Sequence, residues 1–274
     1  MCKRTIIKRK FLSIVLCLSM LLSLLTLASC SDKNNPPDGS GTNPPAAGAE
    51  SIAILYENDV HCAVDGYSKL AAMKAELKGV YDHVGVVSSG DFVQGGTLGA
   101  VSRGTYIVNL MNKVGYDAIA LGNHEFDYQL ARLVELNNLS NTKFLSCNFA
   151  KVGEDKSYFD SYTIVSYGDV EIAYIGITTP ETISSSNPAQ FKNENGELIY
   201  TFGGAEIYDL VQANIDAAEA EGADYVIALS HVGYDESGEL FDITDIVNSG
   251  ENIADLQLIG HNRNLLGPHH YVNG

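Results

Sequence analysis

The sequence predicts an α/β fold in which parallel strands alternate with helices. Two observations favour this fold class. From residue 51 onward, short apolar runs alternate with longer segments whose apolar residues recur at helical spacing. Five of the apolar runs are followed by Asp, Asn or His residues, and the carboxyl ends of parallel strands are where α/β proteins bind their ligands. The chain has 274 residues, enough for one large domain with a substantial core.

The first 50 residues differ in composition and are expected to lie outside this fold. Residues 1–29 combine a basic start with an apolar run, which is typical of a secretory signal peptide. A membrane-spanning anchor is the alternative, and the run is near the lower length limit for one. Leu27-Ala28-Ser29-Cys30 resembles the lipobox of bacterial lipoproteins, in which the cysteine becomes the lipidated first residue. Residues 30–50 would then be a lipidated Cys30 and a flexible linker, holding residues 51–274 at an extracytoplasmic membrane face.

The charge balance disfavours one class of partner. The chain carries 17 basic and 34 acidic residues, a formal charge of −17. Five of the basic residues and no acid precede residue 30, which leaves 12 basic and 34 acidic residues and a charge of −22. A body this acidic repels nucleic acid, so binding to a nucleic-acid duplex is disfavoured. It suits a protein that collects divalent cations, although surplus acid also serves solubility.

The first half of the body predicts strands and helices in turn. Residues 51–56 are rich in branched apolar side chains and predict a strand. Residues 68–80 predict a helix with Leu70, Met73 and Leu77 on its inner face. The same criteria predict strands at residues 83–88, 117–121 and 144–148, and helices at residues 105–114 and 129–137.

The second half continues the alternation. Residues 162–167 and 170–177 flank a Gly-Asp turn and predict a β-hairpin. The polar residues 181–203 are expected to form an excursion loop. A helix is expected at residues 205–221, and strands at residues 224–230 and 255–259.

Polar residues with ligand chemistry follow five of the predicted strands. In chain order they are Asp59 and His61, Asp91, Asn123 and His124, His231, and His261. Parallel strands place their carboxyl ends at one edge of a sheet, so we expect these side chains to converge. Asp127 follows His124 by three residues and can turn back to hold its imidazole. Taken singly, each has an ordinary alternative, such as a surface loop, a turn or a helix cap.

This set of side chains describes a divalent metal site. Carboxylate, imidazole and amide oxygen ligands together suit Zn, Mn, Fe or Co, and a carboxylate shared by two ions would explain a central Asp91. Two ions about 3.5–4 Å apart can clamp a phosphoryl group and lower the pKa of a bound water from 15.7 towards about 7, which gives hydroxide at neutral pH. The sequence contains no Gly-x-Ser-x-Gly motif and no phosphate-cradling Gly-Lys-Ser/Thr sequence.

Two of the five cysteines, Cys62 and Cys147, belong to the predicted body. One disulfide between them is arithmetically possible, but no disulfide framework is implied. Small buried hydrophobic side chains are the default interpretation.

The ordered motifs resemble those of the calcineurin-like metallophosphoesterases: Asp59-x-His61, Gly90-Asp91, Gly122-Asn123-His124-Glu125, Ser230-His231 and Gly260-His261. Their surroundings are similar to the 5′-nucleotidase branch: Phe92-Val93-Gln94-Gly95, Phe126-Asp127 and His231-Val232-Gly233-Tyr234-Asp235. The resemblance covers residues 51 to about 262 and implies a four-layer α/β/β/α sandwich. It also implies metal-dependent hydrolysis of phosphate esters, with nucleotides as the expected substrates.

The resemblance further implies roles for individual residues. Asp59, His61 and Asp91 resemble the ligands of a first divalent metal, with Asp91 bridging to a second. Asn123, His231 and His261 resemble the ligands of that second metal. His124 would not be a ligand; oriented by Asp127, it would stabilise the phosphoryl transition state or assist the leaving oxygen.

Two departures from the family pattern leave an alternative open. The family's last motif is Gly-His-x-His, whereas this chain has Arg263 in place of the second histidine, and a guanidinium cannot coordinate a cation. Nucleotidases of this branch carry a C-terminal domain that binds the nucleoside base, whereas this chain stops at Gly274, so we expect a truncated end. The alternative is a catalytically impaired surface protein that keeps the fold and binds a metal or ligand without turnover.

Overall fold

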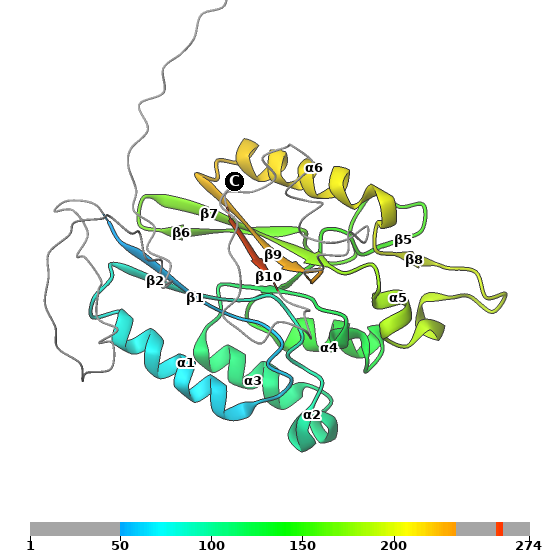
Figure 1. Cartoon of the computed structure of the whole chain (residues 1–274), viewed down its shortest axis with the longest axis horizontal. Coiled ribbons are helices and arrows are strands. Elements are labelled where there is room, and N and C mark those ends of the chain that lie inside the picture. Colours follow the sequence, from blue (N-terminus) through cyan, green and yellow to red (C-terminus); the bar gives the residue numbers. More distant parts are fainter. Residues whose placement is uncertain (1–49, 234–255, 260–274) are drawn as a thin grey trace, which may run out of the picture.

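The computed structural model describes residues 50–233 and 256–259. Its first sheet consists of four parallel strands in the order β1 (Ile52–Glu57), β2 (His83–Ser88), β3 (Ala118–Ala120) and β4 (Phe144–Leu145). The helices between them are α1 (Val64–Leu77), α2 (Gly96–Ser102), α3 (Thr105–Val114) and α4 (Leu130–Leu139). Crossovers between parallel strands share one hand, so these helices lie on the same side of the sheet (Figure 1).

The second sheet has the order β10 (Leu256–Ile259), β9 (Tyr225–His231), β7 (Val170–Thr178) and β6 (Tyr162–Tyr167). The strands β10, β9 and β7 are parallel, whereas β6 pairs with β7 as the antiparallel hairpin that the sequence predicts. The helix α6 (Ile207–Ala220) covers the outer face of this sheet (Figure 1).

Three separate hydrophobic clusters fill the spaces between the layers. In β2, Val86 packs in the cluster on the helix side of the first sheet, while the next residue, Val87, packs in the cluster between the sheets. In β7, Tyr174 faces that same inner cluster, while Ile175 packs with Ile215 of α6. Successive strand residues point to opposite faces, and the two sheets are therefore each apolar on both faces. The predicted four-layer α/β/β/α sandwich is confirmed.

Two details of the helix predicted at residues 68–80 are wrong. The helix α1 begins at Val64, not at residue 68, and Met73 is 50% exposed although it was expected on the inner face. The inner face runs through Tyr67, Leu70 and Leu77, which pack in the core under the first sheet. Met73 lies at the edge of this stripe, where the apolar periodicity of the sequence does not separate buried from exposed positions.

The polar residues 181–203 are not a plain loop, contrary to the prediction. They contain the helix α5 (Thr182–Ser185), a 3-10 turn at Pro188–Phe191, and the strand β8 (Tyr200–Thr201), which pairs with β5 (Ala150–Lys151). Aromatic packing anchors this region: the ring centroid of Phe149 lies 4.7 Å from that of Phe202 and 6.3 Å from that of Phe191. Phe191 and Phe202 thus anchor the mainly polar residues 181–203 against Phe149.

Both cysteines of the body are free and buried, which confirms the default interpretation and rules out a disulfide between Cys62 and Cys147. Within the described ranges, no helix is long and apolar enough to cross a membrane. The predicted signal peptide, Cys30, His261 and Arg263 lie outside the described residues.

Candidate metal centre

The polar residues predicted from the strand ends do converge, but they come from two sheets. The contributing segments are the loops after β1 (Asp59 and His61), β2 (Asp91) and β3 (Asn123 and His124), and the last residue of β9 (His231). Because β9 belongs to the second sheet, the prediction of a single shared sheet edge is wrong. His231 still reaches the site because the sheets are packed together: its Nε2 lies 3.2 Å from both Asn123 Oδ1 and Asp91 Oδ2.

The loop after β1 positions Asp59 and His61 by a left-handed turn. Their φ angles are +52° and +45°, so Asp59 and His61 do not continue the extended backbone of β1. The turn is held from the neighbouring loop, because Asp59 N donates to Gly90 O and His61 N donates to Asp91 O, both at 3.0 Å. The two side chains nevertheless approach each other, with His61 Nε2 3.9 Å from Asp59 Oδ1.

Asp91 stands at the centre of the cluster. The residue is 1% exposed and its φ is +61°. Its Oδ1 accepts a hydrogen bond of 2.9 Å from His124 N, and its Oδ2 lies 3.2 Å from His231 Nε2 and 3.7 Å from His61 Nε2. One buried carboxylate oxygen therefore lies near two imidazole nitrogens, and the bridging role of Asp91 stays a prediction.

A close backbone approach explains the glycine before Asn123. A Cβ atom at Gly122 would collide with Asp91 Oδ1 and would lie 2.8 Å from His231 Cε1. The glycine therefore lets Asp91 and His231 meet over the loop after β3.

Backbone and amide oxygens orient the two imidazoles. His231 Nδ1 lies 2.8 Å from Ser89 O, and His61 Nδ1 lies 3.1 Å from Gln94 Oε1 and 3.3 Å from Gln94 O. Because a carbonyl oxygen only accepts, each Nδ1 carries the proton and each Nε2 is left to face Asp91. Sequence reasoning missed Gln94 and Ser89; Gln94 lies within the quoted motif, but only the fold shows what it contacts.

His124 and Asp127 form the predicted pair. His124 begins the 3-10 turn His124–Phe126, which places residues three apart on one side, and His124 Nδ1 lies 2.6 Å from Asp127 Oδ2. This hydrogen bond raises the pKa of His124 above its ordinary value. The His124 ring packs edge-on to His61, with ring centroids 5.1 Å apart.

The electrostatics of the cluster favour a positive charge between its oxygens. Burial raises the pKa of Asp91, but the His231 imidazole and the His124 N–H outweigh burial and leave this pKa well below its usual range. Burial lowers the pKa of His231, but the Asp91 carboxylate outweighs it and raises this pKa to about 9. A proton on His231 Nε2 can therefore be shared in hydrogen bonds with the oxygens of Asp91 and Asn123. A cation bound between these three side chains would replace that proton.

The ligand atoms fit divalent ions. Atoms that share one ion at about 2.0–2.2 Å lie about 3–3.5 Å apart, close to the separations around Asp91. Among the described residues, two groups have ligand atoms within 4.8 Å of one another: Asp59, Asp91 and His231, and His61, Asp91 and His124. Asp91 belongs to both, which fits a carboxylate shared by two ions. On distance alone, His124 is also a possible ligand.

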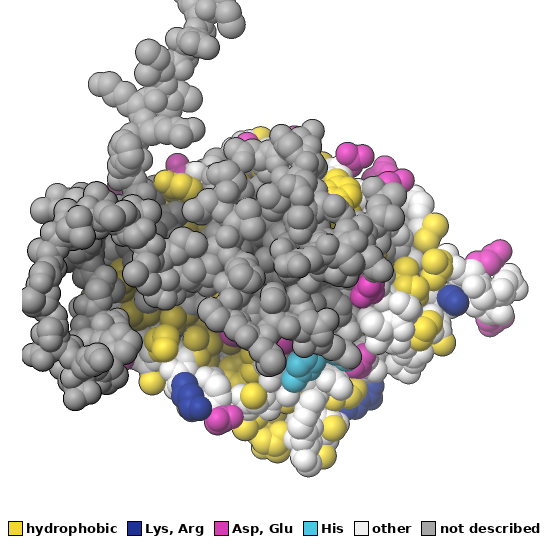
Figure 2. Space-filling model, viewed as in Figure 1, with side chains coloured by type: hydrophobic (Ala, Val, Ile, Leu, Met, Phe, Trp, Pro, Cys, Tyr) yellow, Lys and Arg dark blue, Asp and Glu magenta, His cyan; other side chains and the backbone are white. Residues whose placement is uncertain are grey.

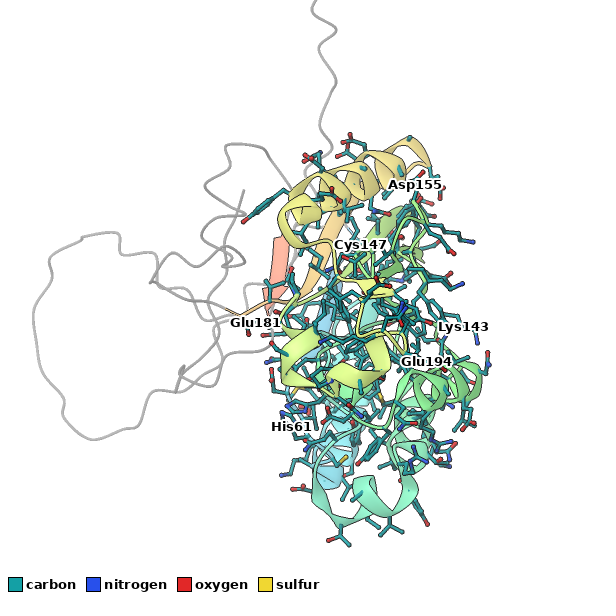
Figure 3. All side chains as sticks on the ribbon, turned by 90° about the vertical axis from the view of Figure 1, so that its right-hand side faces the viewer. His61, Lys143, Cys147, Asp155, Glu181 and Glu194 are labelled. Atoms are coloured by element: carbon teal, nitrogen blue, oxygen red, sulfur yellow. The ribbon has the colours of Figure 1, made fainter. Side chains whose placement is uncertain are left out.

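The site is closed at one end and open at the other. The side chains of Asp91 and His231 are 2% and 0% exposed, whereas that of His61 is 37% exposed. Figure 3 shows His61 at the edge of the ribbon, on the same side as Glu181. Figure 2 shows histidine side chains at the surface with acidic side chains beside them. His61 therefore forms the more exposed end of the cluster and Asp91 and His231 its buried end.

A sequence profile of the calcineurin-like phosphoesterase family matches residues 52–262. The chain belongs to this family, which confirms the resemblance of its motifs and supports the prediction of a hydrolase. Among curated relatives, it is 33% identical over 215 residues to a snake venom 5′-nucleotidase from Gloydius brevicauda and 30% identical over 213 residues to a 5′-nucleotidase from Bos taurus. Each match covers 70% of this chain but only 34% and 35% of the relatives, so the chain spans about a third of their length.

Solved structures show the same fold. The calcineurin-like phosphoesterase YfkN from Bacillus subtilis has a TM-score of 0.64 at 22% identity, over 76% of this chain and 71% of that chain. A putative 5′-nucleotidase from Staphylococcus aureus has a TM-score of 0.63 at 22% identity, over 77% and 45% of the two chains.

Proposed function

We propose that this protein hydrolyses phosphate esters at a site holding two divalent cations that share Asp91. The observation that carries the proposal is the position of Asp91 Oδ2, which lies 3.2 Å from His231 Nε2 and 3.7 Å from His61 Nε2. Asp59, His61 and Asp91 would hold the first ion. Asp91, Asn123, His231 and His261 would hold the second, His261 being outside the described residues.

Zn, Mn, Fe or Co suits this mixture of carboxylate, imidazole and amide ligands. When bound, such ions supply Lewis-acid stabilisation of phosphoryl oxygens and lower the pKa of a coordinated water. Asn123 presents its oxygen to the site, since Oδ1 faces His231 Nε2 at 3.2 Å, while Nδ2 is buried and has no hydrogen-bond partner among the described residues. The amide orientation is the one that a cation requires.

His124 would act on the substrate. Asp127 accepts from its Nδ1 and raises its pKa, which favours the protonated imidazole. Its Nε2–H would then donate to a phosphoryl or leaving-group oxygen. The His124 side chain is 15% exposed, so it can meet a substrate at the open end of the site.

We propose nucleotides as the substrates and an extracytoplasmic membrane face as the location. The nucleotide assignment is supported by the curated relatives, which are 5′-nucleotidases. The location is supported by the signal-like residues 1–29 and the lipobox-like sequence ending at Cys30. Cys30 would carry the lipid, and residues 31–50 would be a linker to the phosphoesterase domain.

The test uses the full chain, purified from membranes in detergent. We expect two Mn²⁺ or Zn²⁺ ions per chain and turnover of p-nitrophenyl phosphate and AMP, with turnover abolished in Asp91→Asn. The matched control is Asp155→Asn, which makes the same charge change at an exposed position away from His61 (Figure 3). At most one ion and no turnover in the wild-type protein would instead support the alternative, a binding protein without catalysis.

A further inference from the structure

The glutamate after His124 is buried at the candidate metal centre, and within the described part of the chain its hydrogen bonds come from backbone N–H groups. Glu125 is 0% exposed. Its Oε2 accepts from Asp91 N at 2.8 Å and from Gly122 N at 2.7 Å, and its Oε1 accepts from Phe92 N at 2.8 Å and from Val93 N at 3.2 Å. All four partners are donors, so the carboxylate form matches this environment.

The contacts join the two loops that carry the central ligands. Three of the donors are the successive N–H groups of residues 91–93, which converge on one anion as backbone N–H groups do in anion-binding nests. The fourth belongs to Gly122, which directly precedes Asn123. One side chain therefore ties the loop after β2 to the loop after β3.

The backbone that Glu125 holds is an unfavourable one. Asp91 has a φ of +61°, in a region that residues with a Cβ atom rarely adopt, and it follows Gly90 at +99°. From this backbone the Asp91 side chain reaches His124 N and His231 Nε2. A change of φ at Asp91 would swing its carboxylate away from both.

We propose that Glu125 is the positioning residue of the metal centre, which holds Asp91 and Asn123 in the geometry needed to share cations before any cation binds. This inference rests on the proposed metal site, but not on turnover. Glu125 does not touch the substrate: it acts through the four N–H groups. A residue of purely structural importance would stabilise the fold without affecting the affinity of the folded protein for metal.

The first experiment measures Mn²⁺ affinity by competition with a chelator, using full-length protein verified as folded by circular dichroism. In Glu125→Gln the side chain keeps its volume, but its NH₂ group faces backbone donors. We expect Mn²⁺ affinity to fall about 10- to 100-fold, the range for residues that orient metal ligands. We expect kcat/KM at limiting Mn²⁺ to fall with it, while KM for the phosphate ester at saturating Mn²⁺ stays unchanged.

Two controls separate positioning from stability. Glu135→Gln makes the same change at a side chain that is 67% exposed and pairs with Arg132. Ile215→Ala destabilises the core beneath α6, in the layer outside the second sheet. If Glu125→Gln lowers the melting temperature as Ile215→Ala does but leaves Mn²⁺ affinity unchanged, the proposal is overturned.

A second experiment needs no variant and stands if Glu125→Gln does not fold. Hydrogen–deuterium exchange of the metal-free wild-type protein should show protection of the amides of residues 91–93 and 122. Free exchange of these amides, with protection appearing only after Mn²⁺ is added, would show that the cation and not Glu125 orders the loops. This result is independent of turnover, so the proposed hydrolysis can fail while the positioning role stands.

Discussion

Replacing His124 by alanine separates two roles that distances alone leave open. The hydrogen bond from His124 to Asp91 Oδ1, 2.9 Å long, comes from the backbone N–H, and alanine keeps that N–H. The metal ligands should therefore stay in place while the proton donor is lost. General acid–base groups contribute about 10²–10⁴-fold, so we expect kcat to fall by that factor, equivalent to about 2.7–5.5 kcal/mol of activation free energy.

The loss of kcat expected for His124→Ala can be compared with the smaller loss expected when only the partner of His124, Asp127, is changed. Asp127 is a charged acceptor 2.6 Å from His124 Nδ1, and hydrogen bonds to charged groups contribute about 1.5–3 kcal/mol. Asp127→Asn should therefore lower kcat by about 10- to 100-fold, less than His124→Ala. Asp127 raises the pKa of His124, and the proposed donor must be protonated. Activity should therefore fall as pH rises through the pKa of His124. Because this pKa is lower in Asp127→Asn, the fall should occur at a lower pH in the variant than in the wild-type protein.

The assay is kcat for p-nitrophenyl phosphate at saturating Mn²⁺, combined with metal content by mass spectrometry. The control is His83→Ala, because His83 begins β2, at the opposite end from the site, where it pairs with Glu50 at 3.8 Å. We expect this control to keep wild-type kcat. Loss of one ion in His124→Ala would refute the reasoning, because it would show that His124 is a ligand together with His61 and Asp91.

Two further predictions concern the loop glycine and the cations. Gly122→Ala should abolish Mn²⁺ binding while circular dichroism stays native, because its Cβ would collide with Asp91 Oδ1. Gly66→Ala is the control, since a Cβ there meets nothing within 4 Å, and equal Mn²⁺ affinity in both variants would contradict the geometry. Removing bound metal with EDTA should lower the melting temperature by about 5–11 °C, because a ligand at 100 times its Kd stabilises by about 2.7 kcal/mol. Scanning calorimetry with and without EDTA measures this, and an unchanged melting temperature would mean that the native protein binds no cation.

The residues at the ends of the predicted strands were correctly expected to lie together, but their arrangement on two sheets was not predicted. The strands before Asp59, Asp91 and Asn123 are short apolar runs. Residues that follow such runs lie at the edge of a sheet, but the run itself does not tell which sheet the strand joins. The position of His231 in a second sheet was not predictable from strand-end reasoning, since β9 has the same local pattern as β1. The packing of one sheet on the other is a property of the whole chain, which only the family resemblance indicated.

Long-range hydrogen bonds explain the remaining misses. The turn at Asp59 and His61 is left-handed because their N–H groups bind the carbonyls of Gly90 and Asp91, some 30 residues away in sequence. A local pattern of Asp-x-His is equally compatible with an extended segment. Glu125 was part of the recognised motif, yet its function lies in backbone donors that carry no residue-specific signal in the sequence.

The strained backbone at the site is held in place by hydrogen bonds between its loops. Four of the six non-glycine residues with positive φ in the described ranges are at this site: Asp59, His61, Cys62 and Asp91. Such residues cost about 1–3 kcal/mol each and persist only where the surroundings hold them. Here the hydrogen bonds between the loops after β1 and β2, and those of Glu125, hold the backbone of Asp59, His61 and Asp91. Because these hydrogen bonds fix the backbone that carries Asp91, loss of the Glu125 carboxylate should release the strain there and move the Asp91 side chain, which is why Mn²⁺ affinity is expected to fall in Glu125→Gln.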